Sequence, residues 1–403
     1  MLQALPLVFV LIGLALYAVL GGADFGAGFW QLFAARDAKG DRVREHAHRA
    51  MGPVWEANHV WLIFVFTVLW TAYPPVFSSI ASTLAILLSL ALLGIIFRGA
   101  AYALRAGAAT PRESARIDTI FSLSSVIVPF ALGAAVGAIA TDRVPVGNAA
   151  GDLWSSWLNG TSIFIGILAV ATSAYLAAVY LAADAAHDRA QELERQFRLR
   201  ALGAGVVAGG LAIAGVFVVD SDSHPLLSGQ ALPAVIVSGL AGIATLVLVY
   251  RRRYEPARYV AALAVAAIIA GWALSRWPTI LSGLTVDQAA AGHDTLVCVI
   301  VAVLVGAVII FPALALLFRL TLAGRFRTPE LPPSDGKTAT HGEWNRRLLA
   351  RLAVACLIAG FGLLTVAETG WAHAVGVFCL FGFIVSAFGA IAVPAVDQNS
   401  TTA

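Results

Sequence analysis

The sequence predicts an all-α protein that crosses a membrane many times, and three observations support this class. Hydrophobic residues make up 60% of the 403 residues and charged residues only 12%. Apolar stretches of about 20 residues, the length that crosses a bilayer core about 30 Å thick, recur along the chain. Of the 26 Lys and Arg residues, all but Arg143 and Arg276 fall on alternate connections between these stretches. A water-soluble protein is therefore excluded.

The apolar stretches predict about eleven transmembrane helices. A segment with three prolines between Gly324 and Glu343 cannot continue a helix and is expected to be a flexible connector. We therefore predict a transmembrane domain over residues 1–320, a cytoplasmic linker over 321–345 and a two-helix extension over 346–403. The expected helices lie near residues 5–34, 53–77, 79–104, 118–140, 158–183, 200–219, 231–250, 259–275, 295–318, 350–366 and 371–393.

The basic residues predict the orientation of the chain. They gather near residues 36–49, 98–116, 189–200, 251–258 and 319–351. Because cytoplasmic loops carry an excess of Lys and Arg, the N-terminus is expected outside and the C-terminus in the cytoplasm. No cleavable signal peptide is expected, since the first basic residue is Arg36 and the opening apolar run exceeds a signal sequence.

The metal-binding residue types predict no metal or cofactor site on this chain. Cys298, Cys356 and Cys379 lie within predicted helices, at spacings that suit neither a zinc site nor a disulfide framework. Only His59 and His373 of the eight histidines fall within or beside an apolar segment, and no second residue pairs with them as a haem ligand. The net charge of +3 reflects loop arginines, so nucleic-acid binding is not implied.

Two acids enter the apolar segments, where a charge persists only with a partner, water or a function. Asp24 lies about 19 residues into the first helix, so at 1.5 Å per residue it is roughly 28 Å from the outer end. Glu56 begins the second helix from the cytoplasmic side, with Pro53 suited to the first turn. Both acids are either structural helix-end charges or the lining of a short proton path from the cytoplasm.

Four further residues are expected to support these acids. Asn58 can offer a neutral hydrogen-bond partner at the depth of Glu56, while Trp55 and Trp61 are expected to anchor or pack the helix. Arg98 lies deeper in its apolar run than Arg105, so two interpretations remain open. It neutralises Asp24 or Glu56, or it is only a basic anchor at the cytoplasmic side.

Several motifs occur in order along the chain: ADFGAG at residues 23–28, PVWEANHVWL at 53–62, FRG at 97–99, and GWAL, WP and LTVDQAA between 271 and 290. Together they resemble subunit II of cytochrome bd-type quinol oxidases, and the likeness spans roughly residues 1–320. The family usually has Asp at the position of Glu56, often has another acid near Gly21 and usually stops after nine helices.

This resemblance implies two four-helix bundles plus a peripheral helix, in a bacterial cytoplasmic membrane. It implies a partner, subunit I, that holds haems b558, b595 and d, or a b-type variant, together with the quinol site. It implies that this chain binds no haem, that it can hold a structural quinone, and that Asp24 and Glu56 deliver protons for the reduction of O2 or support the structure around that site. Membrane lipids surround the complex.

The two C-terminal helices have no counterpart in the resemblance. We hypothesise that they cover a flank that small accessory subunits occupy in some relatives, and a peripheral hairpin without function is the alternative. Glycines at 360, 362, 376, 382 and 389 would permit close helix contact. For the whole chain, two other classes stay open, an ion-coupled secondary transporter and a purely structural scaffold subunit.

Overall fold

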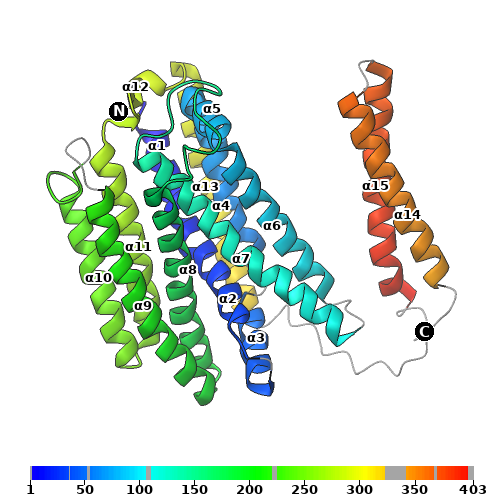
Figure 1. Cartoon of the computed structure of the whole chain (residues 1–403), viewed down its shortest axis with the longest axis horizontal. Helices are drawn as coiled ribbons and strands as arrows, with labels where there is room; N and C mark the ends of the chain where they lie inside the picture. Colours follow the sequence, from blue (N-terminus) through cyan, green and yellow to red (C-terminus); the bar gives the residue numbers. More distant parts are fainter. Residues whose placement is uncertain are drawn as a thin grey trace. The chain divides into compact units, whose positions relative to one another are not determined.

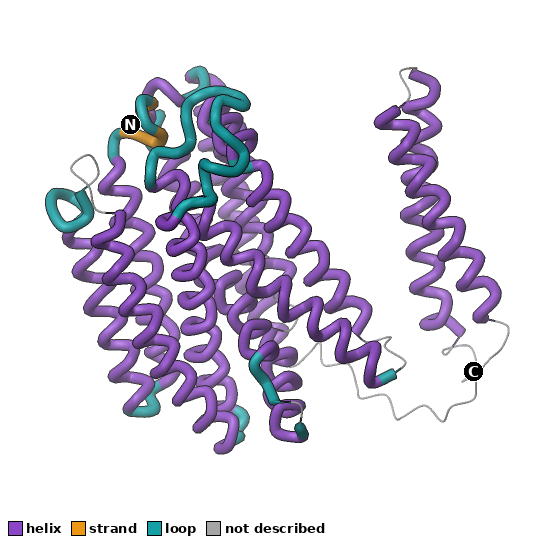
Figure 2. The backbone as a smooth tube through the Cα atoms, viewed as in Figure 1, coloured by secondary structure: helices purple, strands orange, loops and turns teal. Residues whose placement is uncertain are grey.

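The computed structural model describes residues 2–35, 37–51, 55–105, 110–219, 225–322, 342–366 and 370–397. Helices make up nearly all of these residues, and strands are confined to one short hairpin (Figure 2). The chain forms two compact units, Met1–Ala323 and Gly324–Ala403. The all-α class predicted from composition is confirmed.

The first unit begins with one continuous apolar run, Leu5–Leu32, that contains α1 (Leu5–Leu16), a π-helical turn η1 (Tyr17–Gly21) and α2 (Gly22–Leu32). The π-turn is an i→i+5 insertion, a feature that is frequent at functional sites. This run packs against two long helices, α7 and α8, and against α4 (Figure 1). The other helices of this half are α3 (Ala38–Met51), α4 (Trp55–Ala72), α5 (Pro74–Thr83), α6 (Ala85–Arg105) and α7 (Pro111–Ala140).

Four helices in sequence order form the second half of this unit and lie side by side (Figure 1). They are α8 (Gly160–His187), α9 (Gln191–Val219), α10 (Leu232–Tyr250) and α11 (Tyr254–Arg276). A hairpin of β1 (Thr279–Leu281) and β2 (Leu284–Thr285), then α12 (Val286–Ala289), lead into α13 (His293–Leu322). The core between the halves is rich in alanine, which lets α8 approach its neighbours closely.

Length and composition allow eight of the described helices to cross a membrane, and α4 and parts of the two C-terminal helices are shorter apolar helices. The second unit pairs α14 (Gly342–Val366) with α15 (Gly370–Asp397). A Cβ at Gly360 would lie 3.0 Å from the carbonyl oxygen of Gly376, so this glycine contact is confirmed, whereas Gly362 has open space around it. The number of membrane crossings stays a prediction.

Several helix ends differ from those predicted by hydropathy, because prolines and capping side chains determine where a helix starts. The segment predicted over 53–77 is two helices, because Pro74 and Pro75 push Tyr73 out of the helical region (φ −137°, ψ 63°) and Pro74 opens the next helix. The predicted loop over 36–49 contains α3, whose mean hydropathy is too low for a span. The helix predicted from 118 begins at Pro111, where the Thr110 hydroxyl accepts a bond from the Glu113 N–H (3.2 Å).

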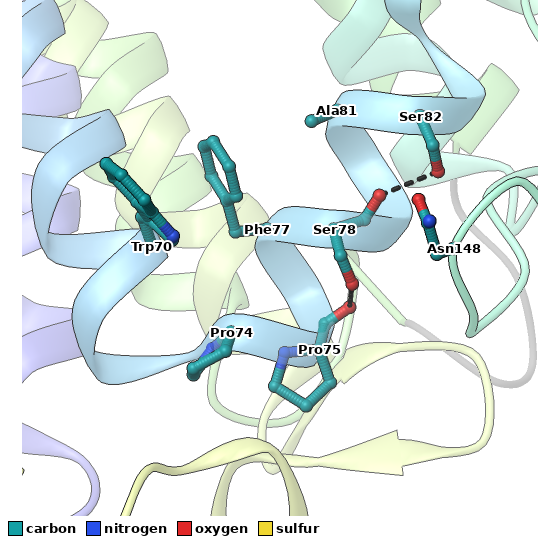
Figure 3. Close-up of a pocket in the computed structure, with 8 residues that line it drawn as sticks. All are labelled: Trp70, Pro74, Pro75, Phe77, Ser78, Ala81, Ser82 and Asn148. Carbon is teal, nitrogen blue, oxygen red and sulfur yellow. Dashed lines mark hydrogen bonds between the residues drawn. The ribbon is translucent and has the colours of Figure 1, made fainter. Parts of the chain in front are cut away.

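Loops cap the end of the unit that holds the N-terminus, and a shallow groove of ≈ 800 Å³ opens there (Figure 3). The rings of Trp70 and Phe77 are stacked 5.9 Å apart on its wall, and the Ser82 hydroxyl accepts a bond from the Ala149 N–H (2.8 Å). The remaining lining residues are Pro74, Pro75, Ser78, Ala81 and Asn148.

An ion pair at the same end explains one exception in the distribution of basic residues. Arg276 is only 4% exposed, and its guanidinium lies 2.7 Å from the Asp142 carboxylate. It also donates to the Ala140 carbonyl (3.4 Å) and so joins α11 to the end of α7. Because the charge is paired, Arg276 does not oppose the orientation predicted from the other basic residues.

Candidate functional site

Asp24 is buried in the first turn of α2, with 9% of its surface exposed. The side-chain amide of Asn58, on α4, donates a hydrogen bond to its carboxylate. The same amide lies 3.4 Å from the carbonyl oxygen of Leu20. Leu20 belongs to the π-turn, so Asn58 ties the irregular turn and the acid to one point on α4.

Arg98 lies on the other side of the Asp24 backbone, and its side chain is only 1% exposed. Its guanidinium donates to the Asp24 carbonyl oxygen (2.9 Å) and to the Ser125 hydroxyl (3.2 Å). Ser125 in turn donates to the Phe121 carbonyl one turn earlier on α7 (2.7 Å). The rings of Phe25 and Phe121 each lie 4.8 Å from the guanidinium carbon, which places the cation between two aromatic faces.

The sequence left two interpretations of Arg98: it neutralises Asp24 or Glu56, or it is only a basic anchor at the cytoplasmic side. The anchor interpretation is wrong, because Arg98 is almost completely enclosed and forms hydrogen bonds to α2 and α7. Arg98 donates its hydrogen bond to the backbone carbonyl of Asp24. The planar guanidinium with its several N–H donors can therefore hold α2 in place as well as balance the charge of the acid. The Arg98 charge therefore lies beside Asp24, while the Asn58 amide donates a hydrogen bond to an oxygen of the Asp24 carboxylate.

Three aromatic rings close the site on the π-turn side. Tyr17 meets Phe25 edge-on at 6.3 Å between ring centroids and meets His59 at 6.1 Å. Phe25 and His59 lie 6.0 Å apart with their planes tilted by 32°. Phe25 therefore contacts the Arg98 guanidinium and also lies beside two further ionisable side chains.

Two glycines let the neighbouring helices reach the acid. A Cβ at Gly26 would lie 1.9 Å from the Ser173 carbonyl oxygen on α8, and one at Gly28 would lie 2.2 Å from the Ser125 hydroxyl. Only glycine permits these approaches. The acid thus lies level with the middle of α7 and α8, and eight residues, about 12 Å of helix, separate it from Leu32.

The other predicted residues are placed only in part. Glu56 and Trp55 belong to the first turn of α4, but their side chains lie outside the described residues, so their roles stay predictions. Trp61 is half-buried, with its ring 6.3 Å from that of Phe311 on α13, which is a packing contact. The structure brings Asp24, Asn58 and Arg98 together.

Sequence reasoning missed several residues of the site, namely Tyr17, Phe25, Phe121 and Ser125. Ser125 carried a signal, because a hydroxyl in an apolar run needs a partner. The aromatic residues carried none, since Phe and Tyr are ordinary in membrane helices. Among the residues that the structure describes, no group of three or more His, Cys, Asp or Glu side chains is arranged to hold a metal ion.

The fold and the site define a polytopic helical membrane protein with a buried acid, amide and guanidinium between its first helices. The family model for cytochrome bd terminal oxidase subunit II matches residues 2–321. The chain therefore belongs to the cytochrome bd terminal oxidase subunit II family, as its motifs predicted.

Individual relatives are more distant. Cytochrome bd-I ubiquinol oxidase subunit 2 of Escherichia coli (strain K12) is 28% identical over 130 residues, 32% of this chain and 34% of the relative. Cytochrome bd ubiquinol oxidase subunit 2 of Bacillus subtilis (strain 168) is 30% identical over 114 residues, 28% of this chain and 33% of that protein. Each match thus spans about a third of the relative's length.

A solved structure extends the likeness of the fold. A chain of the bd oxidase from Geobacillus thermodenitrificans superposes with a TM-score of 0.64 at 24% identity. The match covers 80% of this chain and 98% of that one. The first unit therefore has the bd oxidase fold. The transporter alternative rested on buried acids, broken glycine-rich helices and about eleven spans, whereas the family model that matches the chain is that of an oxidase subunit.

Proposed function

We propose that this chain is subunit II of a membrane quinol:oxygen oxidoreductase, paired with a haem-bearing subunit I in a bacterial cytoplasmic membrane. Quinol oxidation and O2 reduction take place on the partner. This chain supports the partner and supplies protons from the cytoplasmic side. Family membership over residues 2–321 supports the assignment to the complex.

The buried Asp24 carboxyl group is the observation that carries the proton-supply role. A carboxyl group within a helical bundle can hold a proton as the neutral acid and release it as the carboxylate, as intramembrane acids do in relays. The Asn58 amide donates a hydrogen bond to an oxygen of the Asp24 carboxyl group, and the nearby Arg98 charge offsets the cost of burying the ionised form. Glu56, two residues before Asn58 at the start of α4, is positioned by sequence to receive the proton first.

Oxygen consumption by the purified complex tests this role. We expect Asp24→Asn and Glu56→Gln, at equal haem content, to lower quinol-dependent oxygen consumption at least about tenfold, because each variant removes a proton-carrying group but keeps its shape. Asp287→Asn removes an exposed carboxylate on α12 and should retain wild-type turnover.

The scaffold alternative predicts the opposite result. If Asp24→Asn and Glu56→Gln retain wild-type turnover with normal haem spectra, the chain stabilises its partner without supplying protons. If turnover and haem are lost together, Asp24→Glu separates the two roles. That variant keeps a proton-carrying group, so it restores turnover only if proton transfer is required.

A further inference from the structure

The hydroxyl group of Tyr17 is a buried polar atom that the proposed function does not use. Tyr17 is 5% exposed, and its hydroxyl has no hydrogen-bond partner among the side chains and backbone that the structure describes. A buried hydroxyl normally has a partner, because leaving it unpaired costs stability. A phenylalanine would fill the same space without this cost. A water bound in this site would supply the hydroxyl with a partner.

The imidazole of His59 lies beside this hydroxyl-bearing ring. The two ring centroids are 6.1 Å apart, and Phe25 contacts both rings. His59 is half-buried, whereas Tyr17 and Phe25 are enclosed. The three rings therefore extend from the buried interior to the surface of the first unit.

Chain connectivity joins this pair to the Asp24 site. His59 follows Asn58, whose amide binds the Asp24 carboxylate, and Phe25 follows Asp24. Tyr17 begins the π-turn that ends three residues before the acid. Tyr17 and His59 therefore lie within the same contact between η1, α2 and α4 that holds the Asp24 site.

We propose that Tyr17 and His59 form the proton-transfer step that follows Asp24, with a water held by the Tyr17 hydroxyl. This transfer step rests on the proposed function, because the proton that it moves is the one that Asp24 carries. The O–H bond of the Asp24 carboxyl group breaks and an N–H bond forms on the imidazole, through the water, giving a carboxylate and an imidazolium. The imidazolium releases the proton from its other ring nitrogen toward the unit's surface and is neutral again. No electron moves.

Each residue has a distinct part in this step. His59 carries the proton, because neutral imidazole has one donor and one acceptor nitrogen. Tyr17 is a positioning residue that orients the water. The Arg98 guanidinium carbon lies 4.8 Å from the centre of the Phe25 ring, so a fixed cation is kept near both protonation sites.

Proton uptake during a single turnover tests the proposal. The reduced complex is mixed with oxygen, and uptake is followed with a pH-indicator dye while haem oxidation is followed optically. We expect His59→Gln to slow uptake at least about tenfold and Tyr17→Phe to slow it severalfold. Because Tyr17→Phe removes an oxygen that has no hydrogen-bond partner among the described residues, its thermal midpoint should equal or exceed that of the wild type.

Tyr73→Phe is the matched control. Tyr73 is also fully buried, but its hydroxyl donates to the Gln3 carbonyl. Removing that hydroxyl should lower the thermal midpoint and leave proton uptake unchanged. The two Tyr→Phe variants should therefore show opposite effects on stability and on uptake.

The outcomes separate this inference from the proposed function. Wild-type uptake in Asp24→Asn overturns the proposed function. Slow uptake in Asp24→Asn with wild-type uptake in Tyr17→Phe and His59→Gln overturns only the step assigned here. If His59→Gln fails to assemble, Tyr17→Phe decides alone, because it keeps the ring packing, and a wild-type uptake rate then overturns the proposal.

Discussion

At the scale of single residues, the buried charge of Arg98 determines how the site is built. Arg98 is among the largest fully buried side chains in the described chain. A buried cation is stable only when hydrogen bonds and nearby negative or aromatic groups replace its lost hydration. Here a carbonyl, a hydroxyl and two aromatic faces supply that replacement, and they come from two helices, α2 and α7.

Replacing Arg98 with lysine should therefore destabilise the complex. A lysine ammonium is a point charge that cannot form the planar fork or stack between Phe25 and Phe121. We expect a loss of about 2–4 kcal/mol, measured as a lower thermal midpoint. Arg105→Lys, at a partly exposed ion pair with Asp118 (3.1 Å), is the control and should cost less than about 1 kcal/mol. Equal losses would contradict the role of the guanidinium geometry.

His48 on α3, outside the membrane-spanning helices, should make stability depend on pH. Burial, and then the positive charge of Arg105, lower the pKa of His48 to about 4 from its ordinary 6.5. Above pH 6.5 the residue is neutral in both states and contributes nothing. As pH falls toward 4, the unfolded chain binds the proton first, so folding stability decreases.

The effect at pH 5.5 is at most about 1 kcal/mol, because His48 is partly exposed. Thermal midpoints at pH 7.5 and 5.5 measure it. His48→Gln should show a smaller decrease than the wild type over this interval, while His187→Gln, at an exposed histidine, should not. An unchanged decrease in His48→Gln would rule out this contribution.

Residue identity alone predicted the Asp24 carboxyl group and the Asn58 amide of the site but not its aromatic half. Asp24 and Asn58 were identifiable because a polar group in an apolar membrane helix is costly to bury and usually has a partner or a function. The partners of Arg98 were not, because contacts between α2, α6 and α7 depend on how the helices pack. Hydropathy treats Phe25 and Phe121 like any other apolar residue.

At the scale of elements, the packing of α2 against α8 depends on one glycine. A Cβ at Gly26 would lie 1.9 Å from a backbone oxygen and 2.7 Å from the Ala177 methyl group. Backbone cannot move aside as a flexible side chain does, so the two helices would have to separate. The Asp24 site, in the preceding turn, would widen with them.

We therefore expect Gly26→Ala to destabilise the complex by about 2 kcal/mol or more and to reduce turnover. Gly210→Ala, on α9, is the control because nothing lies within 4 Å of its Cβ position. That variant should be neutral or slightly stabilising, as alanine favours the helix. Thermal midpoints and turnover at equal haem content measure both effects, and a harmless Gly26→Ala would show that the helices are not in close contact.

The sequence predicted the existence of the helices better than their ends. Apolar length located each long helix, and Pro74 and Thr110 carried readable signals for a start. The π-turn at Tyr17–Gly21 had no such signal, because an extra residue per turn leaves composition unchanged. It depends on contacts such as that of Asn58 with Leu20.

At the scale of the whole molecule, the chain consists of a family domain followed by a second unit. The division at Ala323 and Gly324 falls close to the end of the family match at residue 321. The proline-rich composition after Gly324 indicated this division in sequence. What the second unit does was not predictable, because most of α14 after Arg351 and of α15 after His373 is apolar and offers no motif that points to a function.

We propose that the second unit covers a flank of the complex and is not needed to fold the first. The Asp24 site draws only on η1, α2, α4, α6 and α7, all within Met1–Ala323. Deleting residues 340–403 should therefore leave haem content and the proton-uptake rate within about twofold of the wild type. If the unit protects a flank, the shortened complex should also lose activity faster in detergent, and added lipid should restore part of it. Loss of haem on truncation would instead make the unit essential for assembly, and unchanged activity, lifetime and haem content would leave it a peripheral hairpin.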